Sequence, residues 1–418
     1  MSKIEELINE LCPDGVEYKT LGALGQFYGG LSGKSKEDFS EGNAKFITYM
    51  NVFSNLSLNI DTTDKVKINE NERQNTIQYG DILFTGSSET PDECGMSSVL
   101  TTETDELLYL NSFCFGLRLN DKKLLDPSFS KYLFRSDEVR KQIKRTASGV
   151  TRFNVSKKKM EQVTIPLPPL PVQQEIVRIL DNFTELTAEL TAELTAELTA
   201  RKKQYEYYRD EFLMNNPNST SVKVKDVTKD RFWIMPATPN FISEKGVPYI
   251  TSKNIRKGKI LFENVKYISE EDYSAISNNR PIIENDILIS MIGTLGEIAI
   301  VQKNDLYFYG QNMFLLRLNE EIINIRYFYH FFDTKVMKKY FNSIKNASSQ
   351  GYLRAQHIEE VNIPLPSIEE QERIVAILDR FDTLCNDLTS GLPAEIEARR
   401  KQYEYYRDKL LSFKEASA

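Results

Sequence analysis

The chain has 418 residues, of which 40% are hydrophobic and 11% aromatic, enough to bury two ordinary cores beside a long helix. No apolar run reaches the about 20 residues of a membrane span, and the N-terminus lacks the apolar stretch of a signal peptide, so we expect a cytoplasmic protein. The net charge of −7 argues against a protein that binds nucleic acid over its whole surface, but it is compatible with local basic patches that bind phosphate.

The first segment of the chain reads as strands followed by a helix. Residues 1–12 form an amphipathic pattern closed by the turn signal Pro13-Asp14-Gly15. Short runs rich in aromatic and β-branched residues then predict strands at 45–53, 64–68, 81–85, 97–101 and 112–119. A helix is expected over 128–146, with a loop over 147–153. This order predicts an α+β module.

A proline-rich elbow at 165–168 leads into a long helix whose middle repeats Thr-Ala-Glu-Leu. Both ends of this stretch return later in the chain: the elbow recurs at 363–366, and the helix end Lys203–Asp210 recurs letter for letter at Lys401–Asp408. The two offsets are the same, 198 residues (363 − 165 and 401 − 203). The two helical stretches therefore have equal length.

The intervening segment repeats the order of the first. Strands are expected at 222–226, 247–251, 286–290, 298–302 and 313–318, and a helix over 325–344. Short echoes support a duplication: 46–48 with 249–251, 81–83 with 286–288, and 117–120 with 316–319. Because the framework residues match while the residues between them do not, the two modules should bind different things.

Apolar residues recur along each helix with a spacing close to the 3.6 residues of an α-helical turn, so each helix should carry one buried stripe. The seven residues 214–220 that come after the first helix reach at most about 25 Å, whereas that helix should be about 63 Å long. We therefore expect an antiparallel rod with one α+β module at each end and a pseudo-twofold axis. Pro393 should interrupt the second helix near Gly391.

Basic residues gather before each elbow, while the rod carries a regular glutamate series. Arg140-Lys141 and Lys338-Lys339 occupy equivalent positions at the offset of 198. They fit either an ordinary solvated helix face or a repeated phosphate clamp whose neighbouring loops read base edges. The candidate DNA-binding residues are Arg140, Lys141, Lys144, Arg145, Ser148, Thr151, Arg152, Lys253, Lys257, Lys338, Lys339, Lys345, Gln350 and Arg354.

Motifs for catalysis or metal binding are not expected. The four cysteines have no paired spacing, which speaks against a disulfide framework or a zinc site. The two histidines, His330 and His357, are interpreted as helix-surface or packing residues. The stretch Gly29–Ser35 resembles a phosphate-binding loop, but its leading glycine is misplaced by one residue. We therefore assign no catalytic residue, metal or cofactor to this chain.

The duplicated elbow, the helix start Gln173–Asp181, the Thr-Ala-Glu-Leu repeats and the duplicated helix end resemble the specificity subunit of a type I restriction-modification system. The resemblance covers essentially the whole chain. It implies target recognition domains at 1–164 and 215–362, each reading one half of a bipartite DNA site. It also implies spacer helices at 165–214 and 363–418 that set the gap between the halves.

In that family the specificity subunit is not an enzyme. The resemblance implies that two modification (methyltransferase) subunits dock on the helices and that restriction subunits join through the assembled complex, while S-adenosylmethionine, ATP and Mg bind these partners. The expected rod and docking residues are Leu186, Leu190, Leu194, Leu198, Tyr205, Tyr208, Leu384, Leu388, Tyr403 and Tyr406.

Two other classes of function stay open. A structural two-headed spacer would explain the rod but not the diverged modules with basic helices. A self-sufficient nuclease or methyltransferase would need the catalytic motifs that are missing. A spacer would show no sequence preference in DNA binding, even with its partners present. A nuclease or methyltransferase would be active when the purified chain is incubated with labelled cofactor and DNA.

Overall fold

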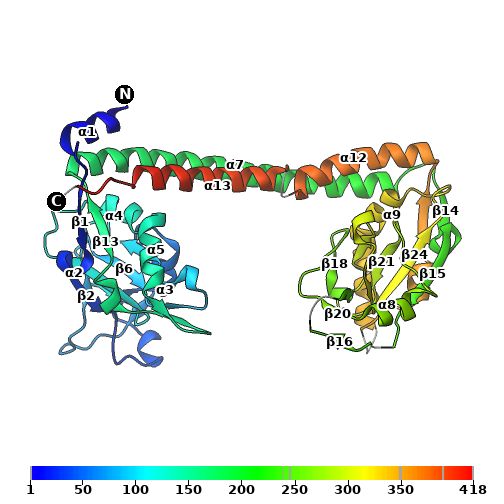
Figure 1. Cartoon of the computed structure of the whole chain (residues 1–418), viewed down its shortest axis with the longest axis horizontal. Coiled ribbons are helices and arrows are strands. Elements are labelled where there is room, and N and C mark those ends of the chain that lie inside the picture. Colours follow the sequence, from blue (N-terminus) through cyan, green and yellow to red (C-terminus); the bar gives the residue numbers. More distant parts are fainter. Residues whose placement is uncertain (1, 238, 244–245, 348–350, 388–389, 417–418) are drawn as a thin grey trace. The chain divides into compact units, whose positions relative to one another are not determined.

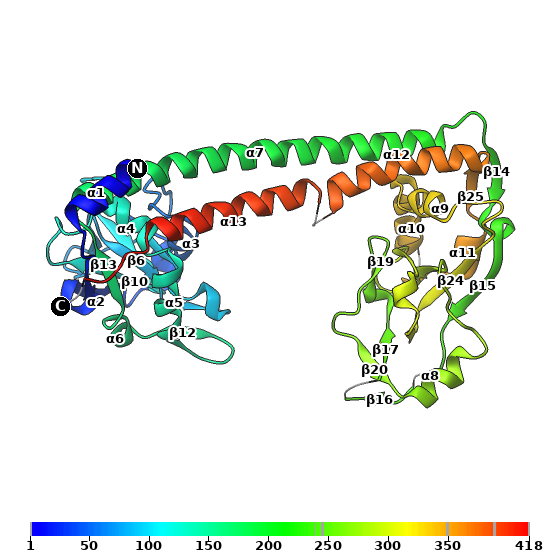
Figure 2. The same ribbon diagram turned by 45° about the horizontal axis from the view of Figure 1, so that its top comes forward.

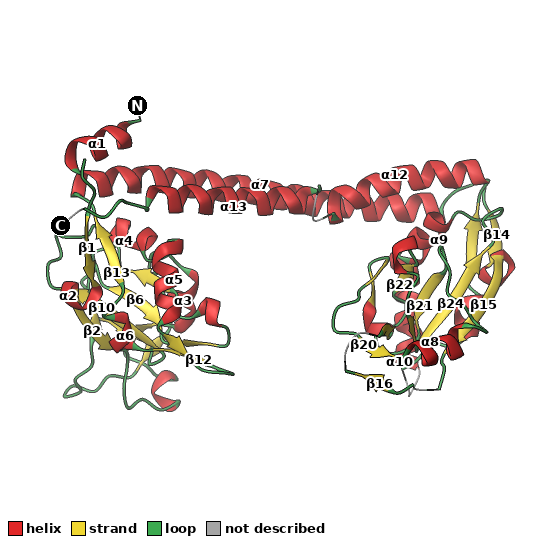
Figure 3. Ribbon diagram, in the orientation of Figure 1, coloured by secondary structure: helices red, strands yellow, loops and turns green. Residues whose placement is uncertain are grey.

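The computed structural model describes residues 2–237, 239–243, 246–347, 351–387 and 390–416. Contacts divide the chain into two compact units: unit 1 comprises Met1–Ala192 and Glu397–Ala418, and unit 2 comprises Glu193–Ile396. The helix α7 (Leu170–Met214) contributes its first half to unit 1 and its second half to unit 2. Each unit mixes short strands with helices (Figure 3). Among the described residues, no helix is long and apolar enough to cross a membrane.

Unit 1 is built on an antiparallel sheet in the order β2 (Gly25–Gly29), β10 (Cys114–Leu119), β6 (Ile82–Thr85), β8 (Ser97–Val99). Helices α4 (Pro127–Leu133) and α5 (Asp137–Arg145) cover it, and Phe84 meets Phe134 edge to face at 5.5 Å. The other elements are α1 (Lys3–Leu11), β1 (Glu17–Thr20), α2 (Leu21–Leu24), β3 (Ala44–Ile47), α3 (Tyr49–Ser54), β4 (Lys65–Val66), β5 (Thr76–Ile77), β7 (Ser87–Ser88), β9 (Leu108–Leu110), β11 (Ala147–Ser148), β12 (Phe153–Val155), α6 (Lys157–Met160) and β13 (Thr164–Leu167).

Unit 2 repeats this plan with a sheet in the order β15 (Thr228–Ile234), β24 (Met313–Leu318), β21 (Ile287–Ser290), β22 (Ile298–Ile300) (Figure 1). Helices α9 (Ile325–Phe332) and α10 (Lys335–Ala347) take the places of α4 and α5. The other elements are β14 (Thr220–Lys223), β16 (Phe241–Ile242), β17 (Val247–Ile250), β18 (Ile255–Arg256), β19 (Lys259–Ile260), β20 (Lys266–Ile268), α8 (Glu270–Ser277), β23 (Tyr309–Gly310), α11 (Ala355–Glu359), β25 (Asn362–Leu365) and α12 (Ile368–Asn386). Helix α13 (Leu392–Leu410) comes next and belongs mainly to unit 1.

Two of the three sequence echoes supply the two partners of an ion pair that both units share. Asp81 is buried and accepts from Arg118 Nε at 2.9 Å and Nη2 at 2.6 Å. Asp286 is buried and accepts from the same two atoms of Arg317, each at 2.9 Å. A two-point contact of this kind fixes the angle between neighbouring strands. The repeated residues are therefore framework.

Each elbow is held by one buried glutamine. The Gln173 amide accepts from the Asp126 N–H at 2.8 Å and donates to the carbonyls of Leu124 and Pro168. Its counterpart Gln371 makes the same three bonds at positions 198 residues later, to Asn324, Ile322 and Pro366. A buried amide with all these partners is costly to replace. It couples the start of the long helix to the turn before α4 or α9.

The long helix is buried most deeply where it meets the two units. Val172, Ile176 and Leu180 pack into the core of unit 1, and Tyr205 and Leu213 into that of unit 2. Helix α13 lies beside α7 within unit 1, and α12 lies beside α7 within unit 2, in both views (Figure 2).

The expected stripe is less continuous than the sequence pattern indicated. Leu190, Leu194 and Leu198 are only half-buried, and Leu186 is 63% exposed, so its placement on a buried seam is wrong. Leu384 and Tyr406 are exposed over more than a third of their surface, and Leu388 lies outside the described residues. These side chains keep apolar surface that could meet another helix.

Some expected elements need correction. The helices expected over 128–146 and 325–344 are each broken in two, because Ser136 and Thr334 turn their hydroxyls back onto the preceding carbonyls at 2.7 Å and start a new helix. The strand expected over 45–53 ends at Ile47, where Thr48 caps α3. The break near Gly391 is confirmed, since α12 ends at Asn386 and α13 begins at Leu392.

Candidate nucleic-acid interface

The basic helix α5 of unit 1 is amphipathic and anchored at its start. Val139 and Ile143 are buried, and the Asp137 N–H donates to the Asp408 carboxylate at 3.0 Å. The cations on the other face remain accessible: Lys141 pairs with Asp137, Lys144 with Asp92 at 2.8 Å, and Arg145 is exposed. Such surface pairs are weak and exchangeable. All three side chains therefore lie at the surface, two of them in ion pairs that solvent or a ligand can exchange.

The expected role of Arg140 as a phosphate contact is wrong. Its side chain is 7% exposed, and its guanidinium donates to the carbonyls of Asp92, Cys94 and Gly95 instead of facing solvent. Burial lowers its pKa to about 10, so the group is still charged at neutral pH. Its counterpart Lys338 is exposed and pairs with Asp333 at 2.6 Å. Arg140 cannot contact phosphate while it holds this turn.

The loop after α5 is the tip of the β11–β12 ribbon, part of a three-stranded sheet. Strand β12 pairs with β11 on one side and with β7 on the other, and Ser148, Thr151 and Arg152 are exposed at the tip. Arg152 donates to Ser87 Oγ from Nη2 at 3.1 Å and lies 5.5 Å from the Phe113 ring centre. Gly149 has φ +150, and a Cβ there would be 1.9 Å from a backbone oxygen. The predicted polar loop is therefore a defined ribbon tip.

The equivalent region of unit 2 is described in part. Lys338 and Lys339 lie exposed on α10, and Arg354 is exposed at the start of α11, where its N–H donates to His357 Nδ1 at 3.2 Å. Lys345 falls within α10 but its side chain lies outside the described residues, as does Gln350.

A second basic element in unit 2 is the β18–β19 hairpin. Lys257 lies in its turn, and Lys253 lies just before it in the short 3-10 helix Ser252–Asn254. Two further exposed cations that the sequence pattern missed, Arg256 and Lys259, belong to its two strands. Lys257 and Gly258 form its two-residue turn with φ values of 48 and 79. The Lys-Gly pair between two isoleucines was the signal for this hairpin.

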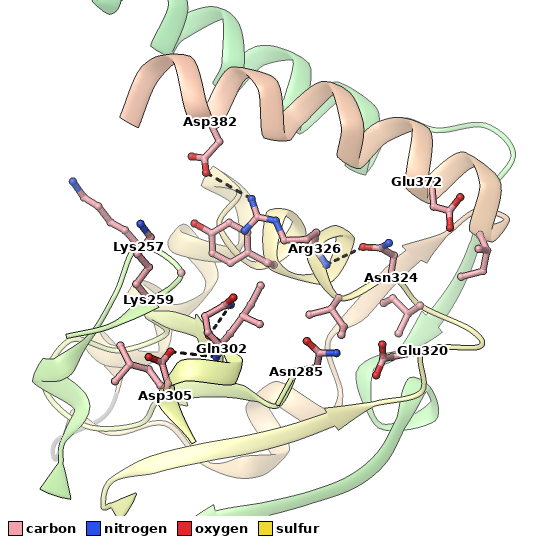
Figure 4. A pocket seen from close by; sticks show the side chains of 17 residues that line it. Lys257, Lys259, Asn285, Gln302, Asp305, Glu320, Asn324, Arg326, Glu372 and Asp382 are labelled. Atoms are coloured by element: carbon pink, nitrogen blue, oxygen red, sulfur yellow. Dashed lines mark hydrogen bonds and ion pairs between the residues drawn. The ribbon is translucent and has the colours of Figure 1, made fainter. Parts of the chain in front are cut away.

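The hairpin borders a cleft of about 860 Å³ in unit 2. Lys257 and Lys259 come from the hairpin, and Glu372 and Asp382 from α12, as Figure 4 shows. Arg326, between them, pairs with Asp379 and lies 3.7 Å from Asp382. The cleft thus mixes both signs of charge and lacks the one-sided field of a phosphate site.

Residues with other conceivable chemistry are engaged elsewhere. Lys34, in the glycine-rich stretch, pairs with Glu72 at 2.6 Å, and this contact lowers the pKa of Glu72 to about 2. His330 is buried, with Nε2 2.7 Å from Asp379 and Nδ1 3.1 Å from the Tyr205 hydroxyl. Burial raises the pKa of each cysteine thiol, to about 12 for Cys114. Within the described residues no cluster of ligands could hold a metal ion.

The sequence matches the family described as type I restriction modification DNA specificity domain over residues 13–200 and again over residues 202–398. The chain belongs to this family. The resemblance drawn from the repeated helix ends is thereby confirmed, and the α+β class with long helices agrees with it. The chain is a non-catalytic DNA specificity subunit of a type I restriction-modification system, and the pure spacer is not favoured.

Relatives support this assignment over about two thirds of their length. The chain is 38% identical over 271 residues to a Haemophilus influenzae protein named as a type I restriction enzyme specificity subunit, covering 64% of this chain and 68% of that protein. It is 36% identical over 273 residues to the EcoR124I/EcoR124II specificity subunit of Escherichia coli, covering 62% and 65%.

Solved structures share the fold at low sequence identity. A chain from a structure of complex assembly and conformational transition of the type I R-M system matches with a TM-score of 0.69 at 17% identity, covering 96% of this chain and 98% of that one. The HsdS subunit from Thermoanaerobacter tengcongensis matches with a TM-score of 0.55 at 17% identity, covering 96% of each chain.

Proposed function

We propose that unit 1 and unit 2 each read one half of a bipartite, asymmetric DNA site. The observation that carries the proposal is a shared framework beneath different surfaces. The Asp81–Arg118 and Asp286–Arg317 pairs are kept, whereas β3 of unit 1 leads into helix α3 and β17 of unit 2 leads into a short 3-10 helix and the basic hairpin of residues 255–260. Two copies of one scaffold with different exposed elements are suited to two different half-sites.

The phosphate-contacting set is revised from the sequence expectation by removing Arg140 and adding two residues of the hairpin, while Lys345 and Gln350, whose side chains lie outside the described residues, stay predictions from the sequence. The set is Lys141, Lys144, Arg145 and Arg152 in unit 1, and Lys253, Arg256, Lys257, Lys259, Lys338, Lys339 and Arg354 in unit 2. Ser148 and Thr151 remain candidates for base edges. Each lost phosphate contact should reduce the salt dependence of binding by about one counterion.

The helices provide the docking sites for two modification subunits in this proposal. Among the expected docking residues, Tyr205 belongs to the core of unit 2 and is unsuited to that role. Tyr207, two residues after Tyr205 on the same helix, is instead 65% exposed, and its counterpart Tyr405 is 62% exposed. The fold does not require these exposed aromatic residues, yet both copies carry them. One copy of the same partner on each unit explains why they match.

Native mass spectrometry of the assembled complex tests this docking. Tyr207→Ala and Tyr405→Ala should each leave one modification subunit bound, and the double variant should leave none. Tyr79→Ala is a matched control, because Tyr79 is also exposed but lies outside the repeated helix end. Retention of both partners by the double variant would contradict the assignment.

The chain itself binds no cofactor in this proposal. S-adenosylmethionine, ATP and Mg would bind the modification and restriction subunits, the latter joining through the assembled complex. Methylome sequencing of cells that carry this chain with its cognate modification subunit tests the bipartite reading directly. A methylated motif with two defined halves and a fixed undefined gap is expected, and a continuous motif would contradict it.

A further inference from the structure

The tip of the β11–β12 ribbon carries an apolar side chain that belongs to no core. Val150 is 91% exposed, the highest value among the exposed large hydrophobic residues of the described chain. A β-branched side chain has few rotamers to lose on binding. While exposed to water, however, it contributes nothing to the stability of the fold. A role for this side chain therefore requires a contact with another molecule that removes it from water.

The ribbon is fixed at its base, so the tip is presented in a defined way. Arg152 is held by Ser87 Oγ at 3.1 Å and by the ring of Phe113, which is itself 57% exposed. Below it, the Cys94 thiol donates to the Phe153 carbonyl at 3.3 Å. Arg140 in turn holds the turn that contains Cys94. A binding element anchored in this way loses little freedom on binding.

Cations flank both legs of the ribbon. Helix α5 ends with Lys144 and Arg145 just before β11 begins, and Lys157–Lys159 come directly after β12 in α6, all three exposed. An apolar tip between two cationic legs matches the cross-section of a DNA groove, with phosphates along the rims and base edges on the floor. The pairing of β12 with β7 reaches only Phe153 and Asn154, so residues 149–152 project beyond the third strand. The major groove admits a two-stranded ribbon, and the apolar group on its floor is the C5-methyl of thymine.

We infer that the β11–β12 ribbon enters the major groove of the half-site read by unit 1, and that Val150 contacts the C5-methyl group of a thymine there. The inference rests on the proposed function and goes beyond it. It assigns the reading element, the groove and one base of the half-site.

Removing the methyl group from the DNA tests the contact without altering any charge. The complex of this chain with its cognate modification subunits is titrated with duplexes of its own motif in which each thymine is replaced, one at a time, by uracil. One position in the half-site of unit 1 should bind about fourfold more weakly, the effect of about one buried methyl group. Val150→Ala should weaken binding to the thymine duplex similarly and bind both duplexes alike.

Val336→Ala is the matched control, because Val336 is a 51% exposed valine of unit 2. It should leave the methyl sensitivity of the first half-site intact. The inference is overturned if that half-site contains no methyl-sensitive thymine, or if Val150→Ala keeps the full sensitivity. If the unaltered complex shows no preference for its motif over a scrambled duplex, the proposed function fails as well.

Discussion

Replacing Arg140 by alanine distinguishes a structural cation from a phosphate contact, and the internal repeat supplies the control. Arg140 and Lys338 occupy equivalent positions on α5 and α10. Arg140 is buried on three backbone carbonyls, whereas Lys338 is exposed beside Asp333. The same substitution should therefore have opposite consequences in the two units.

The expected loss of stability is set by the hydrogen bonds that Arg140 makes. Hydrogen bonds from a charged donor contribute about 1.5–3 kcal/mol each, and they are not additive when they share one side chain. Arg140→Ala leaves the carbonyls of Asp92, Cys94 and Gly95 without this donor, so a loss of about 3–5 kcal/mol is expected. In a unit of about 200 residues this lowers the midpoint of thermal unfolding by roughly 10 °C. Lys338→Ala removes an exposed ion pair and should cost under about 1 kcal/mol.

Scanning calorimetry measures the unfolding transitions, and DNA titrations at several salt concentrations measure the counterion release. Arg140→Ala should destabilise unit 1 and leave the salt slope of the folded protein unchanged. Lys338→Ala should leave both transitions in place and reduce the slope by about one. An Arg140→Ala variant with normal stability and a reduced slope would refute the structural role and restore the phosphate clamp.

Three further predictions concern the units and the helix. Exchange of residues 14–164 for those of another specificity subunit should change one half-site and leave the other intact, as read by methylome sequencing. Deletion of Thr191–Leu194 shortens α7 by about 6 Å and rotates the remainder of the helix by about 40°, so the undefined gap should lose one or two base pairs, and an unchanged gap would refute a metric role. Burial lowers the pKa of His330, and its bond to Asp379 does not offset this. The unfolded chain then takes up the proton first, so unit 2 is most stable above about pH 6.5 and loses stability as the pH falls below it. His330→Gln should remove that dependence in calorimetry between pH 5 and pH 7.

The order of the modules and long helices along the chain was predictable because the sequence contains it in two copies. The common offset of 198 residues located the elbows and the long helices, and Pro393 located the break in the second helix. Short elements were less accessible: the run 45–53 has strand-like composition, yet Thr48 caps a helix in its middle. Local capping overrides composition there, and a pattern of aromatic residues does not reveal it.

The candidate interface was predictable only in part, because a basic residue on a helix can face either way. Arg140 and Lys141 are neighbours in sequence, but 100° of helical rotation puts one beneath the 92–95 turn and the other in solvent. The burial of Arg140 depends on carbonyls some 45 residues earlier in the chain. The sequence carried no signal for that contact.

The two units also show how a framework tolerates chemical change at the point where recognition unit and helix meet. In unit 1 the Tyr132 hydroxyl lies 2.6 Å from Asp181 and 3.1 Å from Thr184, which reaches Tyr403 at 3.0 Å. In unit 2 the position of Tyr132 is taken by His330, and its two ring nitrogens contact the equivalents of Asp181 and Tyr403 directly. The carboxylate and the tyrosine are kept because they stand on the helices, while the group that joins them belongs to the diverged module. Two polar contacts from that module are enough to hold it in register: the Tyr132 phenol makes them in unit 1, with Thr184 of α7 extending one of them to Tyr403, and the His330 imidazole makes them in unit 2. Recognition modules of different sequence can therefore seat on the same helices, as the unit-exchange experiment requires.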